Sequence, residues 1–430
     1  MRSRPGPVLA SAGRGLRPDW VVALSPASPR LVNRFRPPGA GTACGALYTG
    51  VEAAMSPFDA PPDRRGSDSI KWGRYAGRDI LPLWVADMDF AAPPAVLAAL
   101  RRRLDHGVLG YPKVAPSLVA AVVDYLAAHY DWPVDPDWLV WLPGVVPGLN
   151  VACRAVEGDV LVPTPVYPGL LSAPRFSGRR LLTVDLVLTD GAWRLDLDAL
   201  AAALTPQTRL LLLCHPHNPV GRAWSREELD ALAAFARQHE LVVCSDEIHC
   251  GLVLDPGRRH LPFAALGDDA RRRSITLMAP SKTYNVPGLG CSFAVIPDPA
   301  LRRRFIAASR GIVPEMNLLG LVACEAAYRQ GEDWRRQLIA YLGANRDRVQ
   351  AAVAALPGVS MAPVEATCLA WLDVRPLGLA APVAHFEAHG LGLSDGADFG
   401  APGWVRLNFG CPRSTLDQAL ARLVRACQAA

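Results

Sequence analysis

The sequence predicts an α/β protein with a mostly parallel β-sheet, and two features support this prediction. Short apolar runs of strand length recur along the chain, and the segments between them have the spacing of amphipathic helices. Three of these runs lead into polar residues, namely Asn218, Asp246 and Lys282. Because ligands of parallel sheets bind outside the carboxyl ends of the strands, we expect these three side chains to face one crevice.

The other elements are predicted from local signals. Prolines at the start and a glycine after the end support a helix over residues 93–106, and Ser225 with Glu228 forms a capping box for a helix over 225–239. Residues 143–148 are expected to form a turn, followed by a helix from Leu149. We also expect helices over residues 116–129, over 318–356 with a break near Gly331, and from Ser414, and further strands over 138–142, 159–163, 180–185, 366–374 and 403–409.

Length and composition indicate a globular enzyme with two domains. A chain of 430 residues, 50% hydrophobic and 20% charged, is long enough to bury a sizeable core. No apolar run approaches the ~20 residues of a membrane span, so we expect no membrane partner. The ten cysteines are scattered, several of them inside apolar runs, which favours buried thiols in a reducing compartment. We therefore expect a cytoplasmic protein.

Residues 1–54 differ from the rest of the chain. They hold seven Arg, no Lys, one Asp and one Glu, and so carry the whole net charge of +5. Seven Pro and seven Gly without a helical or strand period predict a disordered extension. An arginine-rich start also resembles a transit peptide, but we prefer a tail without structural role, or translated sequence upstream of a true start at Met55. The neutral remainder gives no sign of a nucleic-acid surface.

The run that leads into Lys282 carries the residue most informative about chemistry. A lysine amine forms an imine with an aldehyde cofactor and can later shuttle protons at a substrate Cα. A carboxylate at Asp246 suits a protonated pyridine nitrogen, and an amide at Asn218 suits a ring hydroxyl. The structural alternatives are a solvated lysine, an N-cap for a helix near Glu247, and a turn in Asn-Pro-Val-Gly. Together, the three residues indicate pyridoxal 5'-phosphate (PLP) as cofactor.

A phosphate site is predicted where the strand over 138–142 gives way to a helix. Free backbone N–H groups and the positive end of a helix attract anions. The amides of Val145 and Val146, with the Ser281 hydroxyl, are the expected phosphate contacts. Tyr167 follows a strand end in a proline-rich loop and is expected to stack on the cofactor ring, the alternative being a packed aromatic side chain.

A second constellation offers the side chains that bind zinc. The usual paired spacings of zinc sites are absent, and the residues lie within the strand-end motifs described above. We therefore expect no metal. The residues concerned are Cys214, His215, His217, Cys244, His249 and Cys250.

Seven motifs mark the chain between Phe58 and its C-terminus. They are Lys71-Trp72, Trp84-Val-Ala-Asp-Met-Asp-Phe90, His106-Gly-Val-Leu-Gly-Tyr111, Pro143-Gly-Val-Val-Pro-Gly-Leu149, Pro216-His-Asn-Pro-Val-Gly-Arg222, Ser245-Asp-Glu-Ile-His249 and Arg406-Leu-Asn-Phe-Gly-Cys-Pro-Arg413. In these motifs the chain resembles fold-type I PLP enzymes, specifically the MalY/PatB-type cystathionine β-lyases (C–S lyases) of the class I/II aminotransferase superfamily. The second and last motifs are similar to this branch rather than to aminotransferases generally.

The resemblance implies an architecture and further site residues. A large domain over residues 95–335 would contain a mostly parallel seven-stranded sheet, and residues 55–94 would join 336–430 in a smaller α+β domain. Lys282 would be the Schiff-base lysine, and Arg406 would clamp the substrate α-carboxylate. Tyr111 would reach the phosphate region of the neighbouring subunit in a homodimer. Many aminotransferases have an arginine where this chain has Gly290, which leaves the phosphate without an identified charge partner.

The expected reaction is α,β-elimination of an amino-acid substrate, L-cystathionine or another cysteine S-conjugate, to a thiol, pyruvate and ammonia. An aminotransferase would use the same cofactor residues and stays an alternative. A regulatory protein that binds other proteins is the alternative of another class. The complete set of Lys282, Asp246 and Arg406 argues against a loss of catalysis.

Overall fold

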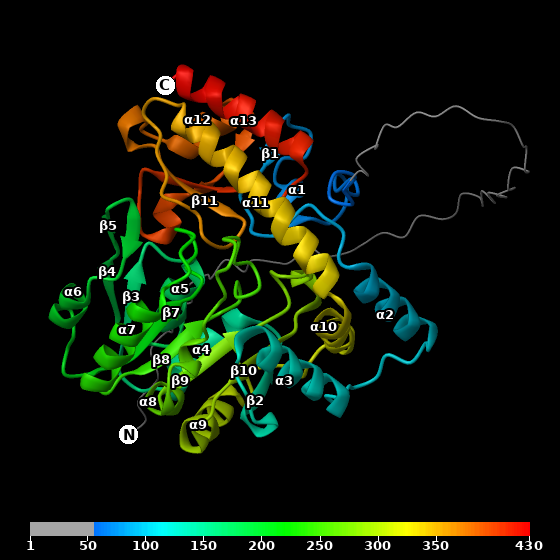
Figure 1. Ribbon diagram of the computed structural model, residues 1–430, viewed down its shortest axis with the longest axis vertical. Helices are drawn as coiled ribbons and strands as arrows, with labels where there is room; N and C mark the ends of the chain where they lie inside the picture. Colours follow the sequence, from blue (N-terminus) through cyan, green and yellow to red (C-terminus); the bar gives the residue numbers. More distant parts are fainter. Residues whose placement is uncertain (1–55) are drawn as a thin grey trace, which may run out of the picture. The chain divides into compact units, whose positions relative to one another are not determined.

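The computed structural model describes residues 56–430, so the prediction of an extension over residues 1–54 lies outside the described part. Its largest sheet has seven strands in the order β2-β10-β9-β8-β7-β3-β4 (Figure 1). β10 pairs antiparallel with β2 and β9, and the other four strand pairs of this sheet are parallel, which confirms the predicted α/β class. The strands are β2 (Leu139–Leu142), β3 (Asp159–Thr164), β4 (Leu181–Asp185), β7 (Thr208–Cys214), β8 (Val242–Asp246), β9 (Ser274–Met278) and β10 (Ser292–Val295).

Helices cover both faces of this sheet, which explains the continuous apolar runs of its strands. Along β7, Leu210 and Leu212 pack into one core, and Leu211 and Leu213 pack into another on the opposite face. The first core includes side chains of α4 (Val145–Ala155), α5 (Pro168–Phe176) and α9 (Pro299–Ser309). The second includes side chains of α6 (Leu197–Ala202), α7 (Arg226–Gln238) and α8 (Asp268–Arg272).

Most predicted helices lie within two residues of their predicted bounds. They are α2 (Pro94–Asp105), α3 (Pro116–Tyr130), α7, α10 (Leu318–Gln330), α11 (Glu332–Ala354) and α13 (Arg413–Gln428), and Gly331 separates α10 from α11 as predicted. Ser225 and Glu228 form the predicted capping box of α7. The sequence reasoning did not assign β10, α5 or α9, which have short or proline-containing patterns.

The predicted start of α4 at Leu149 is wrong, because the helix begins at Val145. Pro147 and Gly148 indicated a turn, but both lie in the early part of the helix. The first four backbone N–H groups of a helix have no partner within it, so a proline there removes no hydrogen bond. Val145 and Val146 are therefore the first two helical residues, with free amides.

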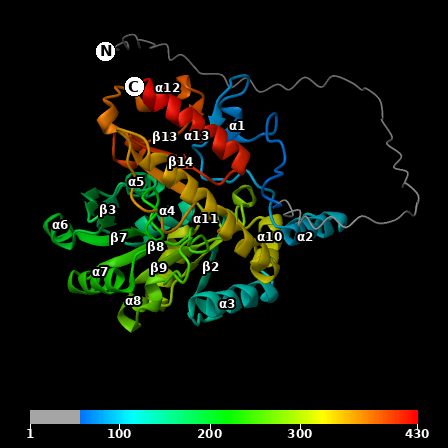
Figure 2. The ribbon, with the colours of Figure 1, turned by 45° about the horizontal axis from the view of Figure 1, so that its top comes forward.

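The C-terminal part forms a second layer around a three-stranded sheet, β11-β14-β13. Its strands are β11 (Leu369–Asp373), β13 (Ser394–Asp395) and β14 (Trp404–Asn408), and its helices include α12 (Pro382–Ala388). In Figure 2, α11 and α13 lie side by side over this part. A parallel pair of β1 (Leu81–Pro82) with β12 (Leu391–Gly392) attaches the N-terminal segment.

One hydrophobic core joins the N-terminal segment to the C-terminal part. Phe58, Leu83 and Phe90 are buried in the same cluster as Leu407 and Leu416. This packing supports the predicted smaller domain of residues 55–94 and 336–430, and its limits stay a prediction.

Two further findings concern the described residues alone. None of their helices combines the length and apolar character that crossing a membrane requires. Their nine cysteines are all free and eight are buried, in agreement with the predicted buried thiols.

Candidate active site

A cavity of about 200 Å³ lies at the carboxyl ends of the parallel strands. The three polar residues at or just after the ends of β7, β8 and β9, namely Asn218, Asp246 and Lys282, all line it, as does Tyr167 after β3. The predicted phosphate contacts Val145, Val146 and Ser281 line the same cavity. The structure thus brings seven of the predicted site residues together in the crevice that sheet topology places there.

A second cavity, of about 520 Å³, continues from the first. Ala86, Tyr167 and Lys282 line both cavities, and Arg406 lines the second. Arg406 and Lys282 therefore face the same chamber. Tyr111 is the one predicted site residue that lines neither cavity. Its side chain is instead 99% exposed.

Lys282 lies in the turn that follows β9, where burial and nearby charges shift the pKa of its amine. Its Nζ donates a hydrogen bond to the carbonyl oxygen of Ala86 at 3.3 Å. Burial lowers the pKa of this amine from its ordinary value, and Asp87 and Asp246 offset part of the effect. A lowered pKa increases the fraction of free amine, which is the nucleophilic and basic form.

Asp246 ends β8 and is 4% exposed. Its Oδ1 accepts a hydrogen bond from the Ile248 amide at 3.1 Å, in a turn rather than the N-cap of a helix. Burial raises the pKa of this carboxyl to about 7. A cation placed beside it would favour the ionised form, so the site suits a protonated ring nitrogen.

Arg406, in β14, is a buried guanidinium without a carboxylate partner among residues 56–430. It donates to the Asn218 Oδ1 at 3.0 Å and to the carbonyl oxygen of Trp84 at 2.8 Å. Its Nε has no hydrogen-bond partner in the described part of the chain, and burial lowers its pKa to about 10. A buried charge that lacks a partner is costly, so this side chain is prepared to receive an anion from the chamber.

The first cavity also offers backbone amides as a possible anion site. Val145 and Val146 present the N-terminus of α4 there. Gly290 also lines this cavity, at the position where many aminotransferases have an arginine. Among the described residues that line the cavity, Lys282 is the only lysine or arginine. We therefore assign phosphate binding to the helix N-terminus and Ser281, as a proposal.

The sequence reasoning missed the side chains that fix residues 84–90 against the lysine. Asn285 accepts from the Met88 amide at 2.9 Å and donates to the carbonyl oxygens of Met88 and Phe90 at 2.9 and 2.7 Å. Asn408 donates to the carbonyl oxygens of Val85 and Asp87 at 2.6 and 2.8 Å. Both lie close in sequence to predicted site residues, three positions after Lys282 and two after Arg406. That proximity was the available signal.

A buried ion-pair network also holds residues 84–90 in place. Lys71 is 0% exposed, and its Nζ donates to Asp89 Oδ2 at 2.8 Å and to the carbonyl oxygen of Asp87 at 3.0 Å. Trp72 donates to Asp89 Oδ1 at 2.9 Å, and Arg64 pairs with both Asp87 and Asp89 at 2.6 and 2.7 Å. The Lys71-Trp72 and Trp84–Phe90 motifs are therefore two sides of one network that supports the Ala86 carbonyl.

Replacing Lys71 by methionine is expected to lower the free energy of unfolding by about 3 kcal/mol, because it leaves buried Asp89 short of a cation. Denaturant unfolding would measure this change. The double variant Lys71→Met with Asp89→Leu should recover part of the loss, since it removes the stranded carboxylate as well. Lys113→Met, at an exposed lysine, is the matched control and should leave stability unchanged. A Lys71→Met protein as stable as the parent would contradict the account of the network.

Three of the side chains weighed as zinc ligands have other partners, because His215 and His217 hydrogen-bond to the carbonyl oxygens of Leu261 and Pro165 at 3.0 and 2.8 Å, and the Cys214 thiol donates to the carbonyl oxygen of Pro216. Glu247 accepts from Ser245, from the Phe263 amide and from His260, the last at 2.6 Å. His249, 2% exposed, lines the first cavity, and burial together with nearby Lys282 lowers its pKa to about 3. Within residues 56–430, no group of three His, Cys, Asp or Glu side chains is arranged to hold a metal ion.

Comparison with known proteins gives the family. The sequence pattern of "Aminotransferase class I and II" matches residues 78–423, most of the chain. The chain belongs to this family. It is 39% identical over 381 residues to cystathionine beta-lyase PatB of Bacillus subtilis, covering 85% of this chain and 98% of that protein.

Two solved structures extend the comparison. The crystal structure of OvoB is 48% identical, with a TM-score of 0.85, and the match covers 87% of this chain and 99% of the other. Cystalysin from Treponema denticola, whose crystal structure contains PLP, is 30% identical with a TM-score of 0.82, and the match again covers 87% and 99%. Members of this family use PLP, and this chain is a PLP-dependent enzyme.

The residues present fit this cofactor. The first cavity offers a lysine of lowered pKa, a buried carboxylate and the amides of a helix N-terminus. These groups suit an aldehyde, a ring nitrogen and a phosphate in turn. Only three lysines occur in the whole chain, and the other two are unsuited, because Lys71 is held by Asp89 and Lys113 is exposed.

Proposed function

We propose that this protein is a C–S lyase that cleaves L-cystathionine, or a related cysteine S-conjugate, to a thiol, pyruvate and ammonia. The observation that carries the proposal is the position of Lys282 and Arg406, which line one chamber and donate hydrogen bonds to the carbonyl oxygens of Ala86 and Trp84 in the Trp84–Phe90 segment. That segment is one of the two motifs in which the chain resembles the lyase branch rather than aminotransferases generally. PatB, with 39% identity, is named as a cystathionine β-lyase.

Arg406, Lys282 and Asp246 have separate roles in the proposed reaction. Arg406 binds the substrate α-carboxylate through its guanidinium and fixes the orientation of Cα. Lys282 would hold the cofactor aldehyde and, with its amine free, would remove the proton from Cα and return a proton later. PLP, when bound, supplies the electron sink for the pair left at Cα, and Asp246 keeps its ring nitrogen protonated.

Elimination then follows from the electron pair at Cα. The Cβ–S bond breaks, its electrons leave with the sulfur, and a proton completes the thiol. One water molecule is consumed when the remaining three-carbon amine hydrolyses to pyruvate and ammonia. No oxidant, reductant or second substrate is needed, which separates this reaction from transamination.

Incubation of the purified holoenzyme with L-cystathionine tests the proposal. We expect thiol, pyruvate and ammonia in equal amounts over many turnovers without any added keto acid. The control is the same reaction with a keto acid, which should not increase the yield. If turnover stops after one equivalent and resumes only with a keto acid, the protein is an aminotransferase and the lyase proposal fails.

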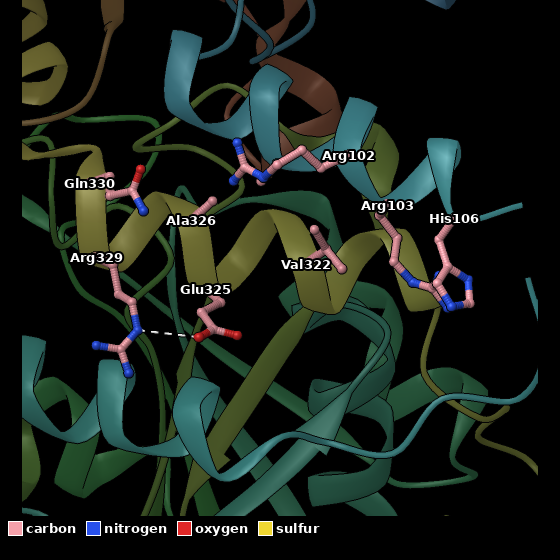
Figure 3. Close-up of a pocket in the computed structure, with 9 residues that line it drawn as sticks. Arg102, Arg103, His106, Val322, Glu325, Ala326, Arg329 and Gln330 are labelled. Atoms are coloured by element: carbon pink, nitrogen blue, oxygen red, sulfur yellow. Dashed lines mark hydrogen bonds and ion pairs between the residues drawn. The ribbon is translucent and has the colours of Figure 1, made fainter. Parts of the chain in front are cut away.

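We further propose a homodimer in which each site borrows Tyr111 from the neighbouring subunit. Tyr111 ends a segment after α2 whose apolar side chains Val108 and Leu109 are 61% and 60% exposed. Next to this segment, a hollow of about 530 Å³ between α2 and α10 is lined by Arg102, Arg103 and other side chains (Figure 3). Exposed apolar and basic groups side by side support a protein interface here.

Hybrid dimers would test the shared site. The Lys282→Ala and Tyr111→Ala variants, mixed after unfolding and refolding, should form hybrids with one site in which both residues are intact. Random pairing is expected to restore about a quarter of wild-type sites, because a two-fold interface places each tyrosine in the other subunit's site. Each variant refolded alone is the control. Activity no higher than that of the unmixed variants, or a monomer by light scattering, would contradict the shared site.

The cytoplasmic location stays a proposal. The buried free thiols of the described residues support it, because such thiols persist in a reducing compartment.

A further inference from the structure

The chamber that holds Arg406 and Lys282 extends beyond the reach of a small amino acid. These two residues line it, and its volume of about 520 Å³ lies within the range of sites for whole small-molecule ligands. Its lining also includes one further basic and two acidic side chains, Arg74, Asp395 and Asp398. Neither catalysis nor cofactor binding, as described above, uses these three residues.

Arg74 contributes positive charge that its neighbours only partly neutralise. Its guanidinium lies over the Trp84 ring, 4.8 Å from the centroid, and its side chain is 46% exposed. Its ion pair with Glu387 is long, at 3.5 Å, and Glu387 also pairs with Arg78 and accepts from the Tyr75 hydroxyl. One carboxylate thus serves two guanidinium groups, and Arg74 retains the capacity to bind an anion.

The two acidic residues lie on a short, rigid turn. Asp395 Oδ1 accepts from the Ala397 amide at 2.9 Å, and the Ala401 amide donates to the Gly396 carbonyl at 2.9 Å. A side chain at Gly396 would collide with the backbone of Ala401 and Trp404, so the turn is closely packed. Asp398 is exposed and makes no hydrogen bond or ion pair within residues 56–430.

We propose that Arg74 and Asp398 form a subsite for the distal end of the substrate, and that this end is itself an amino-acid zwitterion. Arg74 takes the distal carboxylate, and Asp398, with Asp395 beside it, takes the distal ammonium group. Buried Arg406, whose Nε lacks a partner in the described part of the chain, fixes the other end of the same molecule. The inference rests on the proposed C–S lyase function, and it limits the substrates to thioethers with charges of both signs on the sulfur substituent.

Four substrates that differ only in the distal group test the subsite in the holoenzyme. L-cystathionine carries both distal charges, S-aminoethyl-cysteine only the ammonium, S-carboxyethyl-cysteine only the carboxylate, and S-propyl-cysteine neither. We expect the highest kcat/KM for cystathionine. Arg74→Gln should lower kcat/KM for the two carboxylate-bearing substrates, relative to S-propyl-cysteine, by about tenfold, as for the loss of one charge-assisted hydrogen bond. Asp398→Asn should do the same for the two ammonium-bearing substrates.

Arg78→Gln is the matched control, because Arg78 shares the partner Glu387 but does not line the chamber. It should leave the substrate ratios unchanged. Ratios that move in neither Arg74→Gln nor Asp398→Asn overturn the subsite, whatever the absolute rates. If no substrate releases thiol, the lyase function fails instead. Dissociation constants of the same four compounds, from titration of the cofactor's absorption, then decide the subsite: equal values in parent and variants reject it, and the predicted pattern supports it.

Discussion

Replacing Lys282 by alanine is expected to lower the rate of thiol release by about 10³-fold or more, because in the proposed mechanism this one side chain both anchors the cofactor and moves the Cα proton. The variant should retain some PLP without a covalent link, since Asp246, Asn218 and the N-terminus of α4 still line the cavity. Borohydride treatment should therefore attach the cofactor to the wild-type protein and not to the variant.

The chain offers an unusually clear control for this result. The chain has only three lysines, so every alternative attachment point can be tested. Of the other two, Lys71 is buried against Asp89 and Lys113 is exposed. Lys113→Ala should keep both the activity and the borohydride-stable link. Peptide mapping of the reduced protein should find the cofactor on Lys282. A link at Lys71 or Lys113 would refute the assignment.

The sheet and the position of the site could be predicted from the sequence for a physical reason. A strand buried on both faces is largely apolar, apart from small hydroxyl groups such as those of Ser245 and Thr276, and charged or amide side chains lie at its ends. Asn218, Asp246 and Lys282 mark such ends in three adjacent strands, and the sheet order β9-β8-β7 places them side by side. In this case the local apolar pattern and the order of the strands indicate the same position for the site.

The residues that hold the site together were less predictable, because their partners are distant in sequence. Asn285 contacts residues 88–90 from nearly two hundred positions away, and Lys71 pairs with a residue in another motif. The sequence around Asn285 or Lys71 does not indicate which residue each will contact in the folded chain. The start of α4 was missed for a local reason, since Pro147 can indicate either a turn or the first turn of a helix.

Tyr111 illustrates a limit of a different kind. A single chain leaves this side chain 99% exposed, so neither its sequence nor its own fold can bring it to a cavity. Its proposed place depends on a second copy of the chain. The number of lysines, in contrast, was available from the start and limits the possible Schiff-base residues to three.

Replacing Asp246 by asparagine is expected to lower kcat by about 10²–10³-fold, because a fixed charge that supports the reacting state is lost while the shape of the side chain is kept. Cofactor affinity should fall less, since Lys282 remains to anchor it. Absorption spectroscopy of the loaded variant and steady-state thiol release would measure the two effects separately. A variant with wild-type kcat would show that the ring nitrogen does not depend on this carboxylate.

The same substitution should have the opposite effect on the stability of the cofactor-free protein. Burial raises the pKa of Asp246 from 3.8 to about 7. Between these two pH values the folded protein binds more protons at this site than the unfolded chain, so the contribution of Asp246 to stability falls as the pH rises through that window.

Asparagine cannot ionise, so the cofactor-free Asp246→Asn protein should gain in Tm over the parent between pH 5 and pH 8. Bound cofactor should remove this pH dependence from the parent, because a protonated ring nitrogen beside Asp246 favours the carboxylate. A Tm difference between parent and variant that is constant from pH 5 to pH 8 without cofactor would show that Asp246 is ionised in the empty site, and that burial does not control its charge.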